Sequence, residues 1–199
     1  MICAIVLAAG CSRRMGTQKV LLKLGQETII SHIIDQLLAS KVERIFVVAG
    51  HKAKKLEKEL SDKSVSIIYN SQYESGMLSS IRAGLLALPE NCEAVFVVLG
   101  DQPSISAKLV DEMIQSFFTL KKKIIVPVYE KRRGHPILFS TIYKDEILTN
   151  YDDIGLRGIL QAHESDIYEM NVTEPSVLTD MDYPQDYKRE IEIYENRIE

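Results

Sequence analysis

The residues whose types are best suited to binding and catalysis lie within the first twenty positions. An apolar run at 2–7 opens directly into a loop of small residues at 8–19 that carries Arg14 and Lys19. Small side chains let backbone N–H groups come close to a ligand. Arg14 supplies positive charge as a flat fork and Lys19 supplies it as a point charge. This combination suits a phosphate-rich ligand, although the glycine spacing fits neither the P-loop pattern nor G-x-G-x-x-G.

A candidate carboxylate follows a second apolar run. Residues 94–99 are wholly apolar, which predicts a strand buried on both faces, as central parallel strands are. Asp101 follows this run and is therefore expected at the carboxyl edge of the sheet, where open α/β sheets bind ligands. An aspartate at this point can simply cap the next turn. Beside the cationic loop, metal or phosphate binding is the favoured interpretation.

The elements that must position these groups alternate regularly over the first two thirds of the chain. Continuous apolar runs predict strands, and apolar positions at helical spacing predict helices. The predicted strands cover 2–7, 44–49, 65–69, 94–99 and 124–129, and the predicted helices cover 28–39, 52–60, 78–88 and 107–120. This order predicts an α/β fold with three α/β/α layers around a mostly parallel, Rossmann-like sheet.

The alternation stops in the C-terminal half. A hairpin turn over 130–134 and a strand over 136–139 predict antiparallel additions, which are usual at an edge or lid. The remaining predicted elements are helices near 142–148 and up to 163, a strand at 167–172 and a charged helix at 184–195. There are no internal repeats and no linker-like stretch, so 1–199 is predicted to form one domain. His32 and the lysines of 52–60 are predicted to be solvated.

Composition sets further bounds. The 199 residues suffice for one sizeable core, and 46% apolar with 26% charged residues is typical of a globular protein. The net charge of −4 argues against nucleic acid as a partner. Three scattered cysteines without an N-terminal signal peptide predict reduced thiols in the cytoplasm and no cysteine metal site. No apolar run approaches the length of a membrane span, so no membrane association is expected.

The N-terminal loop also resembles a known motif. The pattern L-A-A-G-x-S-x-R-M-G-x-x-K covers 7–19 and is similar to the signature loop of nucleotidyltransferases with a glycosyltransferase-A-type fold. Further matching segments fall in the expected order along the chain. They are Asn70…Gly76-Met77…Ser80…Gly84, Gly100-Asp101-Gln102-Pro103, Arg133-Gly134-His135-Pro136, Gly155…Arg157 and Asp180-Met181-Asp182…Pro184…Asp186-Tyr187.

Together these segments resemble the molybdenum cofactor cytidylyltransferase family over essentially the whole chain. Ala8-Ala9-Gly10 looks like the cytidylyl form of the loop, because related guanylyltransferases carry Ala-Gly-Gly there. Tyr183 departs from the small polar residue usual at its position, but the carboxylates on either side are in place. The resemblance implies transfer of CMP from CTP to the phosphate of molybdenum-bearing molybdopterin, which gives the cytosine dinucleotide cofactor and pyrophosphate.

The resemblance also implies roles for particular residues. Arg14, Lys19 and Asp101 would be catalytic. Mg²⁺ would be the cofactor, held by Asp101 together with either Asp182 or Asp180. The residues that would bind the nucleotide are Leu7, Ala8, Ala9, Gly10, Ser12, Gly16, Lys19, Gly76, Ser80 and Asp101. The residues that would face the second substrate are Gly134, His135, Pro136, Gly155 and Arg157. For His135, simple packing in a hairpin is the alternative.

The implied partners are CTP and a molybdopterin-type substrate, with transient contact to the molybdoenzyme that receives the product or to its chaperone. Two alternatives stay open. One keeps the chemistry and changes the substrates, as in a guanylyltransferase of the same cofactor or a cytidylyltransferase for another phosphorylated acceptor. The other is a nucleotide-binding module without catalysis, which would be expected to lack the lysine or a metal-binding carboxylate. Arg14, Lys19, Asp101 and Asp182 are all present.

Overall fold

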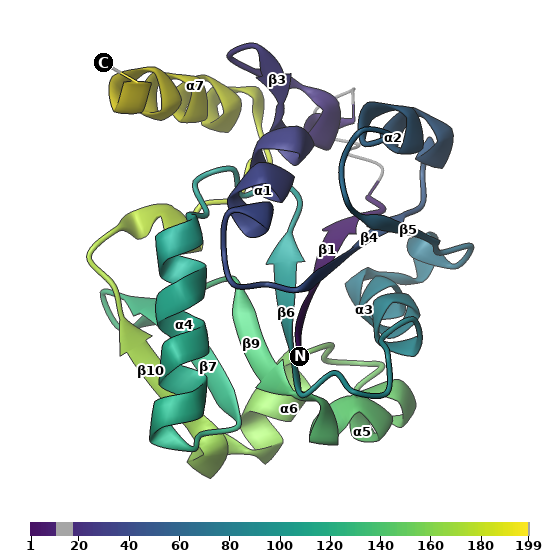
Figure 1. Cartoon of the computed structure of the whole chain (residues 1–199), viewed down its shortest axis with the longest axis vertical. Helices are drawn as coiled ribbons and strands as arrows, with labels where there is room; N and C mark the ends of the chain where they lie inside the picture. Colours follow the sequence, from purple (N-terminus) through teal and green to yellow (C-terminus); the bar gives the residue numbers. More distant parts are fainter. Residues whose placement is uncertain (11–17, 199) are drawn as a thin grey trace.

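A computed structural model of the chain describes residues 1–10 and 18–198 (Figure 1). Its centre is a sheet in the strand order β10-β7-β9-β6-β1-β4-β5, with the short β8 paired to β7. The strands are β1 (Ile2–Ala8), β4 (Arg44–Ala49), β5 (Ser66–Tyr69), β6 (Ala94–Leu99), β7 (Ile124–Tyr129), β8 (Arg132–Arg133), β9 (Ile137–Ser140) and β10 (Ile167–Asn171). A separate two-stranded ribbon joins β2 (Lys23–Leu24) to β3 (Glu27–Thr28).

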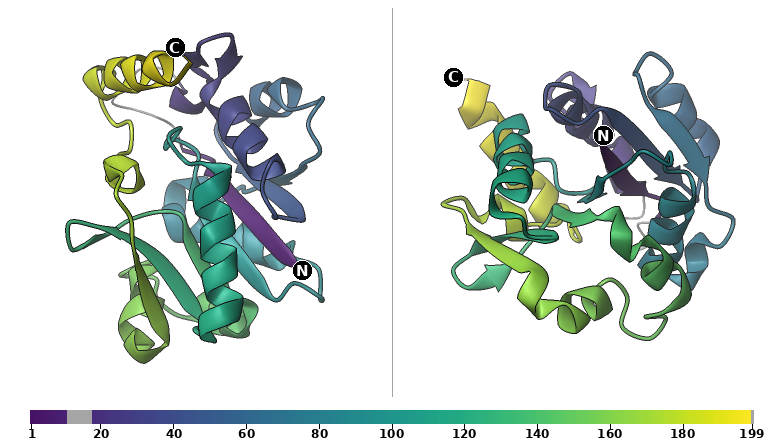
Figure 2. Two further views of the ribbon diagram at one scale, coloured as in Figure 1. Left: turned by 60° about the vertical axis from the view of Figure 1, so that its left-hand side comes forward. Right: turned by 60° about the horizontal axis from the view of Figure 1, so that its bottom comes forward.

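Helices cover both faces of this sheet (Figure 2). The α-helices are α1 (Ile29–Leu38), α2 (Ala53–Glu59), α3 (Met77–Leu86), α4 (Ala107–Leu120), α5 (Lys144–Thr149), α6 (Arg157–Ala162) and α7 (Pro184–Ile198). The 3-10 turns are η2 (Lys19–Leu21), η3 (Tyr73–Ser75), η4 (Thr141–Tyr143), η5 (Glu164–Asp166) and η6 (Pro175–Leu178). Side-chain caps begin α1 and α4, because the hydroxyls of Thr28 and Ser106 accept hydrogen bonds from backbone N–H groups in the first turn.

The core divides into two apolar clusters, one on each face of the sheet. Alternate residues of β1 belong to different clusters: Ala4 and Val6 pack with α1 and α4, whereas Cys3 and Ile5 pack with α3, α5 and α6. A strand whose residues are all apolar can bury both of its faces only where helices cover both sides of the sheet. The predicted α/β class, with three layers and a mostly parallel sheet, is therefore confirmed.

The position of the antiparallel strand differs from the expectation. β9 does not lie at an edge or lid but inside the sheet, antiparallel to both β6 and β7. Its residues Ile137–Ser140 are all buried, and a strand that is apolar on both faces gains most when neighbours cover both of its sides. The tight hairpin after β7 leads instead into β8, which pairs antiparallel with β7.

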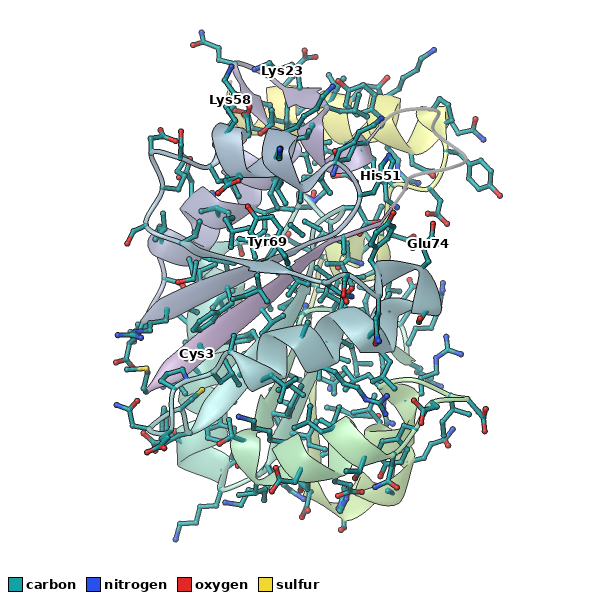
Figure 3. The ribbon with its side chains drawn as sticks, turned by 90° about the vertical axis from the view of Figure 1, so that its right-hand side faces the viewer. Cys3, Lys23, His51, Lys58, Tyr69 and Glu74 are labelled. Atoms are coloured by element: carbon teal, nitrogen blue, oxygen red, sulfur yellow. The ribbon has the colours of Figure 1, made fainter. Side chains whose placement is uncertain are left out.

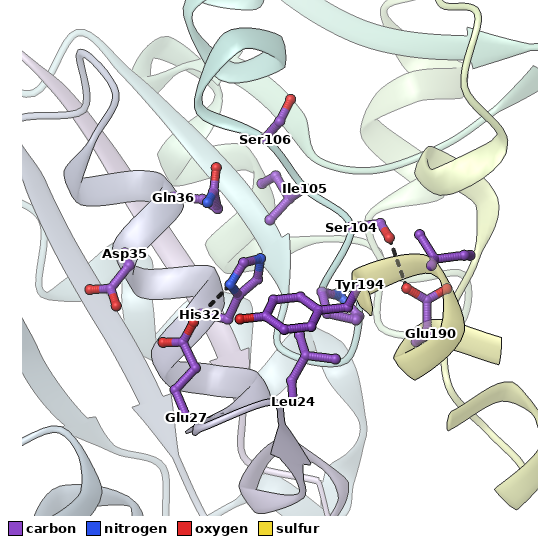
Figure 4. Close-up of a pocket in the computed structure, with 12 residues that line it drawn as sticks. Leu24, Glu27, His32, Asp35, Gln36, Ser104, Ile105, Ser106, Glu190 and Tyr194 are labelled. Carbon is purple, nitrogen blue, oxygen red and sulfur yellow. Dashed lines mark hydrogen bonds and ion pairs between the residues drawn. The ribbon is translucent and has the colours of Figure 1, made fainter. Parts of the chain in front are cut away.

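The environment of His32 also differs from the solvated position expected. Its side chain is only 16% exposed, because α7 folds back beside α1 and the β2–β3 ribbon (Figures 1 and 4). His32 Nδ1 lies 3.0 Å from a carboxylate oxygen of Glu27, and its ring meets Tyr194 edge-on at 5.4 Å. Beside this contact, the hydroxyl of Ser104 donates a buried hydrogen bond of 2.8 Å to the carboxylate of Glu190 in α7. A helical pattern alone does not show that a distant helix covers this side chain.

The expectation for the lysines of α2 agrees with the structure. The lysines of α2 are exposed, and Lys58 points outward in Figure 3. Cys3 and Cys92 are buried free thiols. Across residues 1–10 and 18–198, no helix combines the length and apolar character needed to cross a bilayer.

Candidate active site

A cleft of about 460 Å³ lies at the carboxyl ends of β1 and β6. It brings together all of the predicted nucleotide-binding residues that the structure describes, namely Leu7, Ala8, Ala9, Gly10, Lys19, Gly76, Ser80 and Asp101. Asp180 and Asp182, from the segment before α7, also line it. Arg14, Ser12 and Gly16 lie outside the described residues, so their roles stay predictions.

The parallel strands create this cleft by ending side by side. Leu7 pairs with Leu99 in register, and the N–H of Gly100 donates to the carbonyl of Leu7 at 3.1 Å. A Cβ on Gly100 would approach that carbonyl oxygen to 2.7 Å, so only glycine fits this close approach. The main chains of the two loops are therefore held together at the site.

A cluster of charged side chains stands inside the cleft. Lys19 Nζ contacts Asp101 Oδ2 directly and lies 3.1 Å from Asp182 Oδ1. The N–H of Met181 donates to the Asp101 carbonyl at 3.3 Å, which ties the C-terminal segment to the loop after β6. Burial lowers the pKa of Lys19, but the two carboxylates outweigh it, so its pKa is raised and the ammonium stays charged.

The N-terminus of α3 supplies neutral donors to the same cleft. Gly76 precedes the helix with a φ of +102° and contributes no side-chain cap. The first N–H groups of a helix lack intrahelical partners and favour anions. Asn70 Nδ2 donates to Ser80 Oγ at 3.0 Å and to Ser79 Oγ at 2.9 Å. The buried Asn70 amide thus orients both hydroxyls of the first turn.

A second cleft of about 700 Å³ adjoins the first and shares Met77, Leu99 and Asp180 with it. Of the predicted second-substrate residues, Gly134, His135, Gly155 and Arg157 line this cleft, and Pro136 is buried without lining it. Apolar side chains of α3, β9 and α6 form much of its wall. They include Leu78, Ile81, Ile137 and Leu160, and Leu156 joins them from just before α6.

His135 combines the two situations considered for it, because it lines the second cleft and is also packed in the fold. Its N–H donates to the Val177 carbonyl at 2.8 Å. Burial lowers the pKa of its imidazole, while the Val97 backbone and the Asp101 and Asp180 carboxylates act in the opposite direction. The ring is therefore held neutral near pH 7. Among the described residues, its buried Nδ1 has no hydrogen-bond partner.

Asp101, Asp180 and Asp182 could supply only part of the ligand set of a magnesium ion. In residues 1–10 and 18–198, no group of three acidic, histidine or cysteine side chains is gathered closely enough to hold a metal. Asp101, Asp180 and Asp182 nevertheless line one cleft, and Mg²⁺ usually takes one or two carboxylates and completes its shell with phosphates and water. The donor set therefore fits a metal that arrives with a nucleotide.

Several lining residues were not predicted from the sequence. Tyr73 lines the first cleft, and its ring lies against Gly50, where a Cβ would meet it at 2.7 Å. Figure 3 places His51 near this carboxyl end of the strands, and its ring centroid lies 6.4 Å from that of Tyr73. Arg132 lines the second cleft. No sequence pattern pointed to Tyr73 or to Arg132.

Known proteins share this sequence pattern and fold. The model of the MobA-like NTP transferase domain matches residues 4–167. A molybdenum cofactor cytidylyltransferase of Escherichia coli (strain K12) is 29% identical, covering 92% of each chain. A probable molybdenum cofactor guanylyltransferase of Methanosarcina mazei is 30% identical, covering 78% of this chain and 69% of the relative.

Solved structures agree on the fold. A homologue of Mycobacterium tuberculosis Rv0371c from Mycobacterium sp. strain JC1 superposes with a TM-score of 0.85 at 26% identity, covering 100% of this chain and 98% of the other. Rv0371c itself, in complex with manganese, gives a TM-score of 0.78 at 22% identity, covering 96% and 97%. With a matching family model over most of its length, the chain belongs to the MobA-like family of NTP transferases, which are nucleotidyltransferases.

Proposed function

We propose that this protein transfers CMP from CTP to the terminal phosphate of molybdenum-bearing molybdopterin and releases pyrophosphate. The observation that carries the proposal is the pair of adjoining clefts. One is lined by main chain, a helix N-terminus, Lys19 and carboxylates, and the other by apolar walls and arginines. Transfer between two anions requires charge neutralisation and alignment, and two clefts that meet at Asp180 would hold both reactants for an in-line attack.

In this proposal each part of the first cleft has its own task. The backbone at Ala8, Ala9 and Gly10, with Gly76 and Ser80 at the start of α3, holds the nucleotide. Lys19 neutralises the negative charge that grows on the departing pyrophosphate, aided by Arg14. Before the nucleotide enters, Asp101 and Asp182 raise the pKa of Lys19 against the effect of burial, so the ammonium is charged.

Mg²⁺ is the proposed cofactor, held by Asp101 together with Asp182 or Asp180. When bound, it would act as a Lewis acid on phosphate oxygens. Lys19 now contacts both Asp101 and Asp182. A metal held by these carboxylates would compete with the Lys19 ammonium for them, which would leave the ammonium available to the phosphates.

The proposed preference for cytosine over guanine rests on Ala9 in the loop after β1. Ala9 is buried and lines the first cleft. Its Cβ narrows the space beside the base and limits the backbone angles of the loop. A pyrimidine is smaller than a purine, so this loop favours CTP. The names of the relatives support cofactor chemistry of this kind but divide between cytidylyl and guanylyl transfer.

We place the reaction in the cytoplasm, in keeping with the free thiols of Cys3 and Cys92. A molybdoenzyme or its chaperone would then receive the dinucleotide. The test is incubation with Mg²⁺, molybdopterin-bound molybdenum and either CTP or GTP, with detection of the dinucleotide and of pyrophosphate. The cytosine product, in equal amount to pyrophosphate, is expected. Pyrophosphate release without a dinucleotide would point to another acceptor, and no turnover at all to a binding module.

A further inference from the structure

Two of the arginines that line the second cleft have no ion-pair partner among the described residues. Arg132 and Arg157 both line this cleft. Within the described ranges, 1–10 and 18–198, neither guanidinium makes an ion pair or a side-chain hydrogen bond. Asp180 is the single acidic residue among the described residues that line the cleft, and it lies where the two clefts meet. The cleft therefore carries excess positive charge beside an apolar wall.

The neighbouring arginine shows what a structural role looks like here. Arg133 donates to Glu164 at 2.5 Å and to Glu169 at 2.7 Å, and these carboxylates hold its pKa above the ordinary value although burial opposes them. Arg132 precedes it in β8, and both arginines line the second cleft. Arg133 is therefore already paired within the fold, whereas the exposed guanidinium of Arg132 has no ion pair among the described residues.

Strained turns present both unpaired arginines. Glu130 and Lys131, with φ of +47° and +64°, form the two-residue turn before Arg132. This turn normally takes asparagine or glycine. Tyr151 has a φ of +77° in the turn that leads to Arg157, and its ring packs so closely against Gly158 that a Cβ there would clash with it. Backbone strain of this kind persists where the surrounding structure enforces it, often at ligand sites.

We infer that Arg132 and Arg157 together bind the phosphate of the second substrate, and that Arg132 is a specificity-determining residue for a phosphorylated acceptor. This inference rests on the proposed function for the identity of the acceptor. Arg132 lies in β8 and Arg157 begins α6, so the two arginines come to the cleft from different segments, and each can form a forked pair with phosphate oxygens. The apolar wall formed by α3 and α6 would cover the uncharged part of the acceptor.

The test compares Arg132→Gln and Arg157→Gln with Lys131→Gln. Lys131 is an exposed cation on the same turn and does not line the cleft. Arg132→Gln is expected to raise the KM for the molybdopterin acceptor about tenfold or more and to leave the KM for CTP within about twofold. Lys131→Gln should change neither value. Arg132→Lys should recover part of the loss, because it restores charge without the fork.

A second measurement separates this inference from the proposed function. With CTP and Mg²⁺ saturating the first cleft and no acceptor present, inorganic phosphate is titrated and followed by phosphorus NMR. The unmodified protein should bind phosphate at least about threefold more tightly than Arg132→Gln does. Equal phosphate affinity for the unmodified protein, Arg132→Gln and Lys131→Gln would overturn the arginine pair, even if the dinucleotide is formed. Failure to form the dinucleotide, with the phosphate difference intact, would overturn only the acceptor assignment.

Discussion

The two clefts are built in different ways. The first lies where β1 and β6 end side by side, and the main chain of Ala8, Ala9 and Gly10 forms much of it. The second is formed by the side chains of α3, α6 and β9 and by arginines on tight turns. Topology alone positions a main-chain site, whereas a side-chain site depends on individual residues. Substitutions in the first cleft should therefore affect chemistry, and those in the second should affect acceptor choice.

The largest effect is expected from Asp101→Asn. The change removes the carboxylate that follows β6 and contacts Lys19, so metal-dependent turnover should fall to background. The free energy of unfolding should change little, because Lys19 keeps its ion pair with Asp182. The measurement is turnover across a Mg²⁺ titration, with unfolding followed in parallel. Asp35→Asn, which breaks the ion pair with Lys63 elsewhere, is the matched control. A near-normal rate at saturating Mg²⁺ would remove Asp101 from the metal site.

The second-largest effect is expected from Lys19→Ala. Negative charge on pyrophosphate grows in the transition state, so kcat should fall further than CTP binding weakens. Loss of one such contact is typically worth about 3 kcal/mol, or on the order of a hundredfold in rate. Steady-state kinetics with varied CTP provide the check, with Lys63→Ala as a control for a paired lysine. If KM alone changed, Lys19 would be a uniform binding residue.

The first cleft could be predicted from the sequence better than the second, for a physical reason. Apolar strands followed by small residues reveal where a parallel sheet ends, so the sequence alone suffices to group Ala9, Lys19 and Asp101. The interior position of β9 could not be predicted, because a short apolar run does not identify its neighbours. Arg132 was missed because an arginine in a hairpin is usually solvated, and only the pairing of Arg133 with Glu164 and Glu169 sets it apart.

Ala9→Gly should change nucleotide choice. The unmodified protein is expected to prefer CTP over GTP by at least about tenfold, since discrimination by shape is worth roughly 1–3 kcal/mol. Removal of the Cβ should relax this preference. The measurement is kcat/KM for both nucleotides with one acceptor, on both proteins. A preference that survives unchanged would place selectivity elsewhere, most simply around Ser80.

The smallest effect is expected from Gly134→Ala in the second cleft. A Cβ at Gly134 would clash with the Val177 carbonyl oxygen, so β8 or η6 must shift. Overpacking of this kind typically costs about 1–3 kcal/mol, and the acceptor KM should rise while the CTP KM holds. Gly10→Ala is the control for stability, because no described residue lies within 4 Å of its Cβ position. Equal unfolding midpoints for the two variants would contradict the close packing at Gly134.

The most direct test of cytidylyl transfer is a competition in one reaction. Equimolar CTP and GTP are supplied with Mg²⁺ and limiting molybdopterin-bound molybdenum, and the two dinucleotides are separated and counted. We predict that the cytosine dinucleotide exceeds the guanine dinucleotide by at least about tenfold, the ratio of the two specificity constants. Equal amounts of the two products, or an excess of the guanine dinucleotide, would contradict the assignment of this protein as a cytidylyltransferase.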